Sequence, residues 1–229
     1  MRLVKRQKQT SIREVHAIRG ISFVANHGDA IGIIGRNGSG KSTLLRAIAG
    51  LLPADSGAVY TSGQAALLGV NAALLDDLTG ERNVVLGCLA MGMQPAEVKE
   101  KYDHIVDFSG VGRFIDLPMR AYSSGMASRL RFAIASAKSH KILMIDEALA
   151  TGDAAFRTKS RDRIAELRAE AGTVFLVAHN LGEIEENCNR VIWMETGKII
   201  RDSENVPAVI DEYLVATGGE PRDREQARL

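Results

Sequence analysis

Short apolar runs alternate along the chain with longer segments in which apolar residues recur every three or four positions. The short runs, rich in Val, Ile and Leu, predict buried strands, and the longer periodic segments predict amphipathic helices. The strands expected from this pattern cover residues 31–34, 58–60, 65–68, 142–145, 173–178, 191–194 and 198–201. Because helical segments separate most of these strands, the pattern predicts an α/β core.

The stretch between residues 80 and 138 differs from the rest, because its apolar residues recur at helical spacing throughout. Pro95 suits the first turn of a helix that extends to about Phe108. We expect further helices over residues 41–50 and 154–171, and a turn at Thr196 and Gly197 between the last two strands. The sequence therefore predicts a helical insert that interrupts the α/β core.

Composition and charge exclude several classes of protein. The chain has 45% hydrophobic residues, and its 29 basic and 28 acidic side chains give a net charge of +1. Nucleic-acid-binding proteins usually carry a clear basic excess, so no nucleic acid is expected as a partner. The apolar runs are shorter than the roughly 18 residues that a membrane span needs. Cys88 and Cys188 are too few for a disulfide framework and are expected to be reduced and buried.

Residues 35–43 read GRNGSGKST and fit the phosphate-binding pattern G-x-x-x-x-G-K-[ST], between a predicted strand and a predicted helix. In this pattern, backbone N–H groups and the helix N-terminus surround the β- and γ-phosphates of a nucleotide. Lys41 adds a positive charge, the Ser42 hydroxyl suits Mg²⁺, and Thr43 suits the α-phosphate side. The predicted nucleotide contacts are Gly35, Arg36, Asn37, Gly38, Ser39, Gly40, Lys41, Ser42 and Thr43.

Two acidic residues directly follow the strand predicted at residues 142–145. Asp146 is placed to hold Mg²⁺ through its water shell, and Glu147 is placed to polarise an attacking water or accept its proton. An apolar strand that ends in two acids is a weak signal alone, but the phosphate loop earlier in the chain strengthens it. Together they predict phosphoryl transfer from a nucleoside triphosphate.

A third motif identifies the family. Residues 122–126 read YSSGM and open an amphipathic helix, for which we expect Ser124 to be the N-cap. Placed before the two acids, this segment resembles the LSGGQ signature of ABC-type ATPases. The resemblance continues through DEALATGDAAF, which places Asp153 in the D-loop, and through VAHN, which places His179 as the switch histidine.

This resemblance implies an α/β fold of the P-loop NTPase class, with an ABC-type ATPase core, an antiparallel β part and a helical subdomain near residues 80–138. It implies one ATP-binding domain over residues 1–218, followed by a polar tail over 219–229 that we expect to be disordered. It also implies ATP and Mg²⁺ as ligands. In the family, Ser123, Ser124 and Gly125 would complete the ATP site of a second copy, so we expect a head-to-tail dimer.

Further details resemble the ATPases that export cell-envelope polysaccharides such as O-antigen, teichoic acid and galactan. These details are YSSGM, DEALATGDAAF and LTGERNV at residues 78–84. They imply a peripheral subunit at the cytoplasmic face of the cell membrane, paired with a separate transmembrane permease that carries a lipid-linked polysaccharide. We expect a cytoplasmic helix of the permease to dock near residues 70–79, where Leu74 and Leu75 serve either as contacts or as core residues.

Two family features are missing from this sequence. The glutamine that usually precedes the Leu-Thr segment is absent, and Asn71 is the nearest amide. The aromatic residue that stacks on adenine is also absent, because Phe23 falls in the next predicted strand. His16 is the ring left to stack on the base, although an ordinary turn histidine is the favoured interpretation. The chain holds no carbohydrate-binding domain of the kind appended in some O-antigen exporters, so we expect that it does not read the polymer end.

Other functions compete with polysaccharide export. The chain could be the ATPase of an ABC transporter for a drug, a lipid or a solute, or an ABC-type ATPase without a transporter that acts on DNA or ribosomes. The single cassette and the low net charge disfavour the second class. A different P-loop enzyme, such as a small-molecule kinase, is disfavoured by the signature motif and by His179.

Overall fold

The fold is described from a computed structural model that covers residues 16–68, 74–146, 154–178 and 180–220. Its centre is a six-stranded sheet in the order β2-β3-β4-β1-β5-β6, in which the first five strands are parallel and β6 is antiparallel to β5. The strands are β1 (Ala30–Ile34), β2 (Ala65–Leu68), β3 (Ile142–Asp146), β4 (Thr173–Val177), β5 (Arg190–Glu195) and β6 (Lys198–Ser203).

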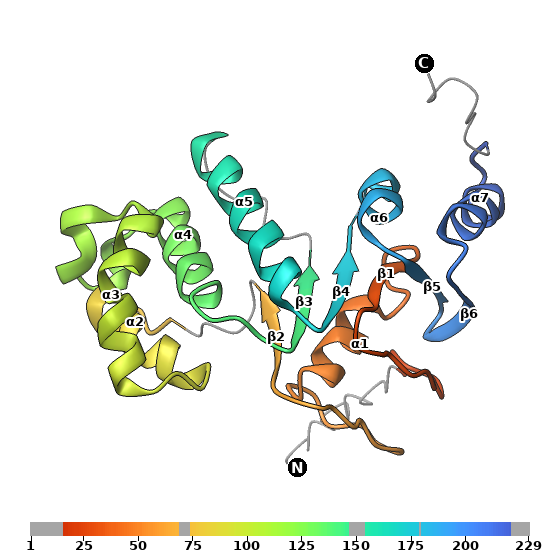
Figure 1. The fold of residues 1–229 in the computed structure, drawn as a ribbon, viewed down its shortest axis with the longest axis horizontal. Coiled ribbons are helices and arrows are strands. Elements are labelled where there is room, and N and C mark those ends of the chain that lie inside the picture. Colours follow the sequence, from red (N-terminus) through yellow and green to blue (C-terminus); the bar gives the residue numbers. More distant parts are fainter. Residues whose placement is uncertain (1–15, 69–73, 147–153, 179, 221–229) are drawn as a thin grey trace, which may run out of the picture.

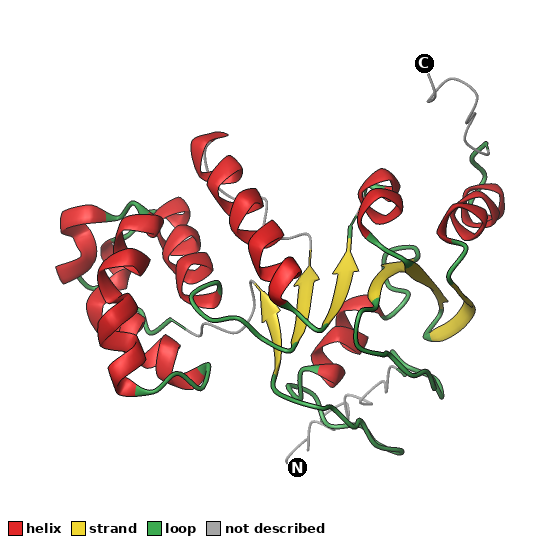
Figure 2. Ribbon diagram, viewed as in Figure 1, coloured by secondary structure: helices red, strands yellow, loops and turns green. Residues whose placement is uncertain are grey.

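Helices cover both faces of this sheet (Figures 1 and 2). Helix α1 (Lys41–Ile48) packs on one face through Leu44, Leu45 and Ile48. The opposite face is covered by α5 (Ala154–Glu170), α6 (Leu181–Asn187) and α7 (Val206–Ala216). Successive strand residues point to opposite faces. Ile33 therefore belongs to the hydrophobic cluster on the α1 face of the sheet, while Ile34 belongs to the cluster on the opposite face. Strands covered on both faces must be apolar throughout, which explains the short apolar runs.

A helical insert lies between β2 and β3 in the sequence and to one side of the sheet (Figure 1). Its helices are α2 (Gly80–Ala90), α3 (Pro95–Ser109) and α4 (Ser124–Ala135), with two short 3₁₀ turns at Gly112–Asp116 and Met119–Ala121. Helix α3 begins with a capping box between Gln94 and Glu97 and with Pro95 in its first turn. The insert expected from the sequence at residues 80–138 is therefore present.

Two local predictions were wrong. Residues 58–60, expected to be a strand, have no strand geometry, and Tyr60 is 93% exposed. A strand needs a partner for its backbone groups, and among the described residues nothing pairs with this run. Phe23, placed in a strand by its neighbours, lies in irregular backbone and packs edge-on against Phe175. The predicted antiparallel part is the β5–β6 hairpin, and an isolated antiparallel bridge also joins Thr79 and Pro118.

The β5–β6 hairpin confirms the turn that we predicted at Thr196 and Gly197. Thr196 and Gly197 both have positive φ values, of 47° and 79°, which suits a two-residue hairpin turn. The antiparallel strand β6 is the last strand of the sheet and lies beside β5. In the part of the chain that the structure describes, no helix is both long and apolar enough to cross a lipid bilayer.

Candidate nucleotide-binding site

The loop between β1 and α1 turns back on itself through glycines. Gly35 and Gly40 have φ values of 148° and 105°, which side-chain-bearing residues rarely adopt. A Cβ atom at Gly35 would lie 2.2 Å from the carbonyl oxygen of Met194, and one at Gly40 would lie 2.6 Å from that of Ala17. The glycines of the predicted phosphate loop are therefore required both by backbone geometry and by close neighbours.

The N-terminus of α1 opens directly onto this loop. Gly40 is its N-cap and provides no side-chain cap, so no side chain in the described residues occupies the first-turn N–H groups. These groups, together with the helix dipole, make a binding site for a phosphate. The apolar face of α1 fixes the helix to the sheet, and that packing holds the N-terminus in place.

Lys41 is the first residue of α1 and reaches back over the loop. Its Nζ donates hydrogen bonds to the carbonyl oxygens of Gly35, at 2.6 Å, and Arg36, at 3.1 Å. Partial burial lowers the pKa of Lys41 from its usual value, and the nearby Asp146 carboxylate opposes that shift. These two hydrogen bonds hold the ammonium group against the start of the loop.

Ser42 and Asp146 come together from distant parts of the sequence. The Ser42 Oγ donates a hydrogen bond of 3.3 Å to Asp146 Oδ2, at the carboxyl end of β3. A hydroxyl beside a carboxylate is an oxygen set that Mg²⁺ accepts, usually together with phosphate oxygens and water. The described residues contain no group of three His, Cys, Asp or Glu side chains able to hold a metal ion. A divalent cation held by Ser42 and Asp146 would take its further ligands from phosphate oxygens and water.

One contact of the phosphate loop was not predicted from the sequence. Ser39 is buried, and its carbonyl oxygen accepts a hydrogen bond of 2.9 Å from the N–H of Gly197 in the β5–β6 turn. No local motif marks this contact, because Gly197 is far from the loop in sequence. Arg36, Asn37 and Gly38 are exposed at the loop tip, where they are accessible to a ligand.

His16 lies near the phosphate loop. It is exposed, and its carbonyl oxygen accepts a hydrogen bond of 3.4 Å from Arg19 Nε. The carbonyl of the next residue, Ala17, borders Gly40 closely. The structure thus brings the segment of His16 beside the loop, while its stacking on a base stays a prediction.

The signature segment lies elsewhere in the molecule. Ser123, not Ser124, is the N-cap of α4, because its backbone is extended and its Oγ accepts a hydrogen bond of 3.2 Å from the N–H of Met126. Ser124 is already helical, which corrects our expectation. Helix α4 packs into the hydrophobic cluster on the face opposite α1, so Ser123, Ser124 and Gly125 belong to a different part of the chain from the phosphate loop.

Four predicted residues lie outside the described parts of the chain, namely Glu147, Asp153, His179 and Asn71. The structure does place what flanks two of them. Glu147 directly follows Asp146, the last residue of β3. Asn180, directly after His179, caps α6 by accepting a hydrogen bond from the N–H of Gly182. The roles of the four residues stay predictions.

Comparisons with known proteins agree with this geometry. Residues 18–150 match the protein family described as "ABC transporter". The teichoic acids export ATP-binding protein TagH of Enterococcus faecalis is 39% identical over 205 residues, which cover 90% of this chain and 46% of that protein. The O-antigen export system ATP-binding protein RfbB of Klebsiella pneumoniae is 38% identical and covered to 83%, with 89% of this chain aligned.

Solved structures show the same fold. The structure of an ATP-binding subunit of an ABC transporter has a TM-score of 0.71 at 22% identity, with 89% of each chain covered. A dimeric structure of the ATP-binding cassette MJ0796, bound to ADP and Pi, has a TM-score of 0.66 at 21% identity, and covers 82% of this chain and 90% of that one.

The chain spans 46% of the Enterococcus faecalis TagH and 65% of its Listeria monocytogenes counterpart, so it corresponds to part of those longer proteins. The family match covers more than half of the chain. Together with the relatives and the solved structures, it confirms the family and the fold class that we inferred from the motifs. The family match over residues 18–150 and the relatives show that the chain belongs to the ABC transporter family.

Proposed function

We propose that this chain is the ATP-hydrolysing subunit of an ABC exporter that moves a lipid-linked cell-envelope polysaccharide across the cytoplasmic membrane. The observation that carries this proposal is the 38% identity to an O-antigen export ATP-binding protein, of which the chain spans 83%. Relatives named for teichoic acid export support the same substrate class. The chain would act at the cytoplasmic face of that membrane as a peripheral subunit.

The chemistry at the site is phosphoryl transfer to water. Lys41 and the backbone N–H groups of the loop would hold the β- and γ-phosphates of ATP, since both face the same space. Glu147 would accept a proton from the attacking water, and His179 would contact the γ-phosphate. Ser42 and Asp146 have the oxygen chemistry to hold Mg²⁺, which would neutralise phosphate charge when bound.

A second copy of the chain would complete each site. Ser123 and Gly125 are placed on α4, in a different cluster from α1, so one chain lacks a signature segment at its own phosphate loop. The exposed serine hydroxyls at the start of α4 would contact the nucleotide of the partner. The dimeric cassette MJ0796 supports this arrangement.

A transmembrane permease would dock beside the start of the insert. Leu75 is 52% exposed, although Leu74 packs partly against the core. Exposed apolar side chains at this place suit a helix of a membrane partner. Lipid-linked polysaccharide would be carried by that permease.

Export in the native host tests the proposal. Deleting the gene should remove the envelope polysaccharide from the cell surface and leave its lipid-linked form inside the cell. The intact gene should restore the surface polymer. A gene carrying Lys41→Ala should not, because the phosphates lose their counter-charge, whereas Lys99→Ala on the exposed side of α3 should restore it. Normal surface polymer in the deletion strain would reject the substrate class.

Docking has a separate test. Leu75→Asp should weaken co-purification with the permease while leaving ATP binding by the isolated chain intact. Leu86→Asp, an equally exposed leucine on α2, is the matched control. Undiminished association of the Leu75→Asp chain would place the docking surface elsewhere.

A further inference from the structure

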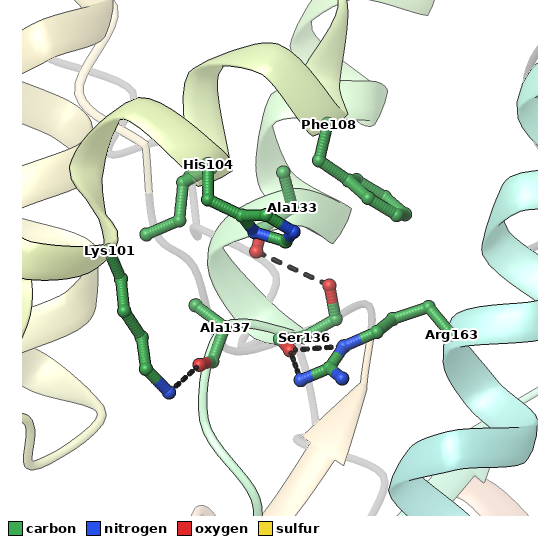
Figure 3. Close-up of a pocket in the computed structure, with 8 residues that line it drawn as sticks. Lys101, His104, Phe108, Ala133, Ser136, Ala137 and Arg163 are labelled. Atoms are coloured by element: carbon green, nitrogen blue, oxygen red, sulfur yellow. Dashed lines mark hydrogen bonds between the residues drawn. The ribbon is translucent and has the colours of Figure 1, made fainter.

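A pocket of about 270 Å³ lies where the helical insert meets the core helix α5 (Figure 3). It is far from the phosphate loop in sequence, and none of the residues assigned to nucleotide lines it. No acidic residue is among the side chains that form its wall. Three lining residues carry side-chain nitrogen donors, four are apolar and one is a serine, namely Lys101, His104, Arg163, Ile105, Phe108, Ala133, Ala137 and Ser136.

Two basic side chains of this pocket, Lys101 and Arg163, form hydrogen bonds with the C-terminal end of α4. Lys101 Nζ donates a hydrogen bond of 2.9 Å to the Ala137 carbonyl oxygen, and Arg163 donates two, of 3.1 and 2.9 Å, to that of Ser136 (Figure 3). The last carbonyls of a helix lack partners and carry partial negative charge, so they attract cations. One cation comes from the insert and the other from the core, and both are fixed at the same point.

These hydrogen bonds leave donors unused. The ammonium of Lys101 has three N–H groups, of which one is engaged. Arg163 engages its Nη1 with Glu166, whose side chain is 60% exposed, and keeps one further N–H on each terminal nitrogen. His104 makes no hydrogen bond among the described residues. No acidic side chain lines the pocket, so its lining side chains offer more N–H donors than carboxylate acceptors.

The apolar wall has a fixed shape. The Phe108 ring stacks on Phe132 with centroids 5.9 Å apart and meets the ring of Phe156 edge-on at 5.8 Å. Ile105 and Ala133 are buried beneath it. Lys159 Nζ also lies 5.5 Å from the centroid of the Phe108 ring. The volume of about 270 Å³ restricts a ligand to a size just below the usual range of small-molecule sites.

We propose that this pocket binds a small phosphate monoester with a single apolar ring. The phosphate would take N–H donors from Lys101, His104 and Arg163, and the ring would lie against Phe108. Arg and Lys donors at fixed positions suit a dianionic phosphate better than a neutral ligand. Because the ligand would join α3 of the insert to α5 of the core, its binding would hold these two parts at one mutual angle.

Calorimetric titration with phenyl phosphate tests this site in the full chain. Saturating ADP fills the phosphate loop during the titration, so the readout does not depend on ATP hydrolysis or on transport. Lys101→Gln and Arg163→Gln should each weaken phenyl phosphate binding about tenfold, as expected for the loss of a charge-assisted hydrogen bond. The controls Lys99→Gln on α3 and Arg157→Gln on α5 remove the same charge from exposed positions outside the pocket and should leave the affinity unchanged.

Other outcomes overturn the proposal. Equal weakening by the controls would mean attraction to net charge alone. Phenyl phosphate binding that ADP displaces, or that Lys41→Ala abolishes, would place the ligand in the phosphate loop. Equal affinity for phenol would mean an apolar site without a phosphate. Circular dichroism checks that each variant is folded, and Phe108→Leu provides a second route, since it should weaken phenyl phosphate while leaving inorganic phosphate unaffected.

Discussion

At the scale of single residues, Asn83 shows how one buried amide can organise a loop. Its Oδ1 accepts a hydrogen bond from the N–H of Leu75, and its Nδ2 donates to the carbonyl oxygens of Leu75, Leu78 and Thr79. The side chain is 2% exposed. The segment before α2 is therefore held to the helix by a residue of the LTGERNV motif whose role the sequence alone does not reveal.

Asn83→Leu should lower the free energy of unfolding by about 2–4 kcal/mol, because it leaves several buried backbone groups without partners. Urea denaturation measures this change. Arg82→Leu, on the exposed neighbouring position, should stay within about 0.5 kcal/mol of the parent chain. Equal stability of the Asn83→Leu chain would show that these hydrogen bonds are replaced by water.

The two cysteines should be chemically inert in the folded chain. Burial raises the pKa of Cys188 to about 12 and that of Cys88 to about 11, from an ordinary value of 9.0. Since the thiolate is the reactive form, alkylation by iodoacetamide at pH 8 should be at least about 100-fold slower in the folded than in the unfolded chain, as read by mass spectrometry. Cys88 is buried as expected, whereas Cys188 is only half-buried, so rapid alkylation of Cys188 would contradict the raised pKa of its thiol.

The raised pKa values of Cys88 and Cys188 also determine how the stability of the chain changes with pH. A raised pKa means that the folded chain favours the neutral thiols, so this contribution to stability is complete below pH 9 and decreases as the pH rises toward 12. Cys188→Ala should reduce the loss of stability between these pH values. Thermal unfolding measured across the alkaline range provides the comparison.

At the scale of elements, the start of α4 shows how far a pattern can locate a helix end. The Ser-Ser pair indicates a cap, but only the backbone decides which serine is extended and which is helical. Sequence patterns set helix ends only to within a residue or two. By contrast, the start of α3 was predictable, because Pro95 and the Gln94–Glu97 capping box both mark it.

Ser123→Ala should destabilise the chain by about 1 kcal/mol, since α4 loses the cap of its first turn. Ser124→Ala is the matched control and should change the stability little, because Ser124 is the first helical residue. Urea denaturation without nucleotide separates this effect from any contact with ATP, and Ser123→Asp should restore the cap. A larger loss for Ser124→Ala would reverse the assignment.

At the scale of the whole molecule, much of the fold was predictable from periodicity alone. Apolar runs located β1 to β5, because strands buried on both faces must be apolar throughout. The sixth strand, β6, is mostly polar and exposed, and its place after the Thr-Gly turn located it. The run at 58–60 failed, because strand pairing depends on partners that a local pattern cannot reveal. The Ser42–Asp146 contact followed from motif spacing, while the Ser39–Gly197 contact depends on how distant strands are ordered.

A further prediction concerns the proposed dimer of two chains. Glu147→Gln should bind ATP, hydrolyse little of it and form a stable dimer, because the attacking water loses its base while the nucleotide stays between two chains. Size-exclusion chromatography with light scattering measures the mass, and phosphate release measures the activity. Glu195→Gln, at the exposed end of β5, should resemble the parent chain. A monomeric and fully active Glu147→Gln chain would contradict the mechanism.

The place of β1 in the sheet also determines the order in which the molecule can be made. Its neighbours are β4 and β5, with Ala30 beside Val174 and Ile31 beside Arg190. During translation, the strand that carries the phosphate loop leaves the ribosome long before either partner, whereas α2, α3 and α4 are close in sequence and contact one another. We therefore expect the phosphate loop to reach its folded geometry only after β5 emerges, later than the helical insert.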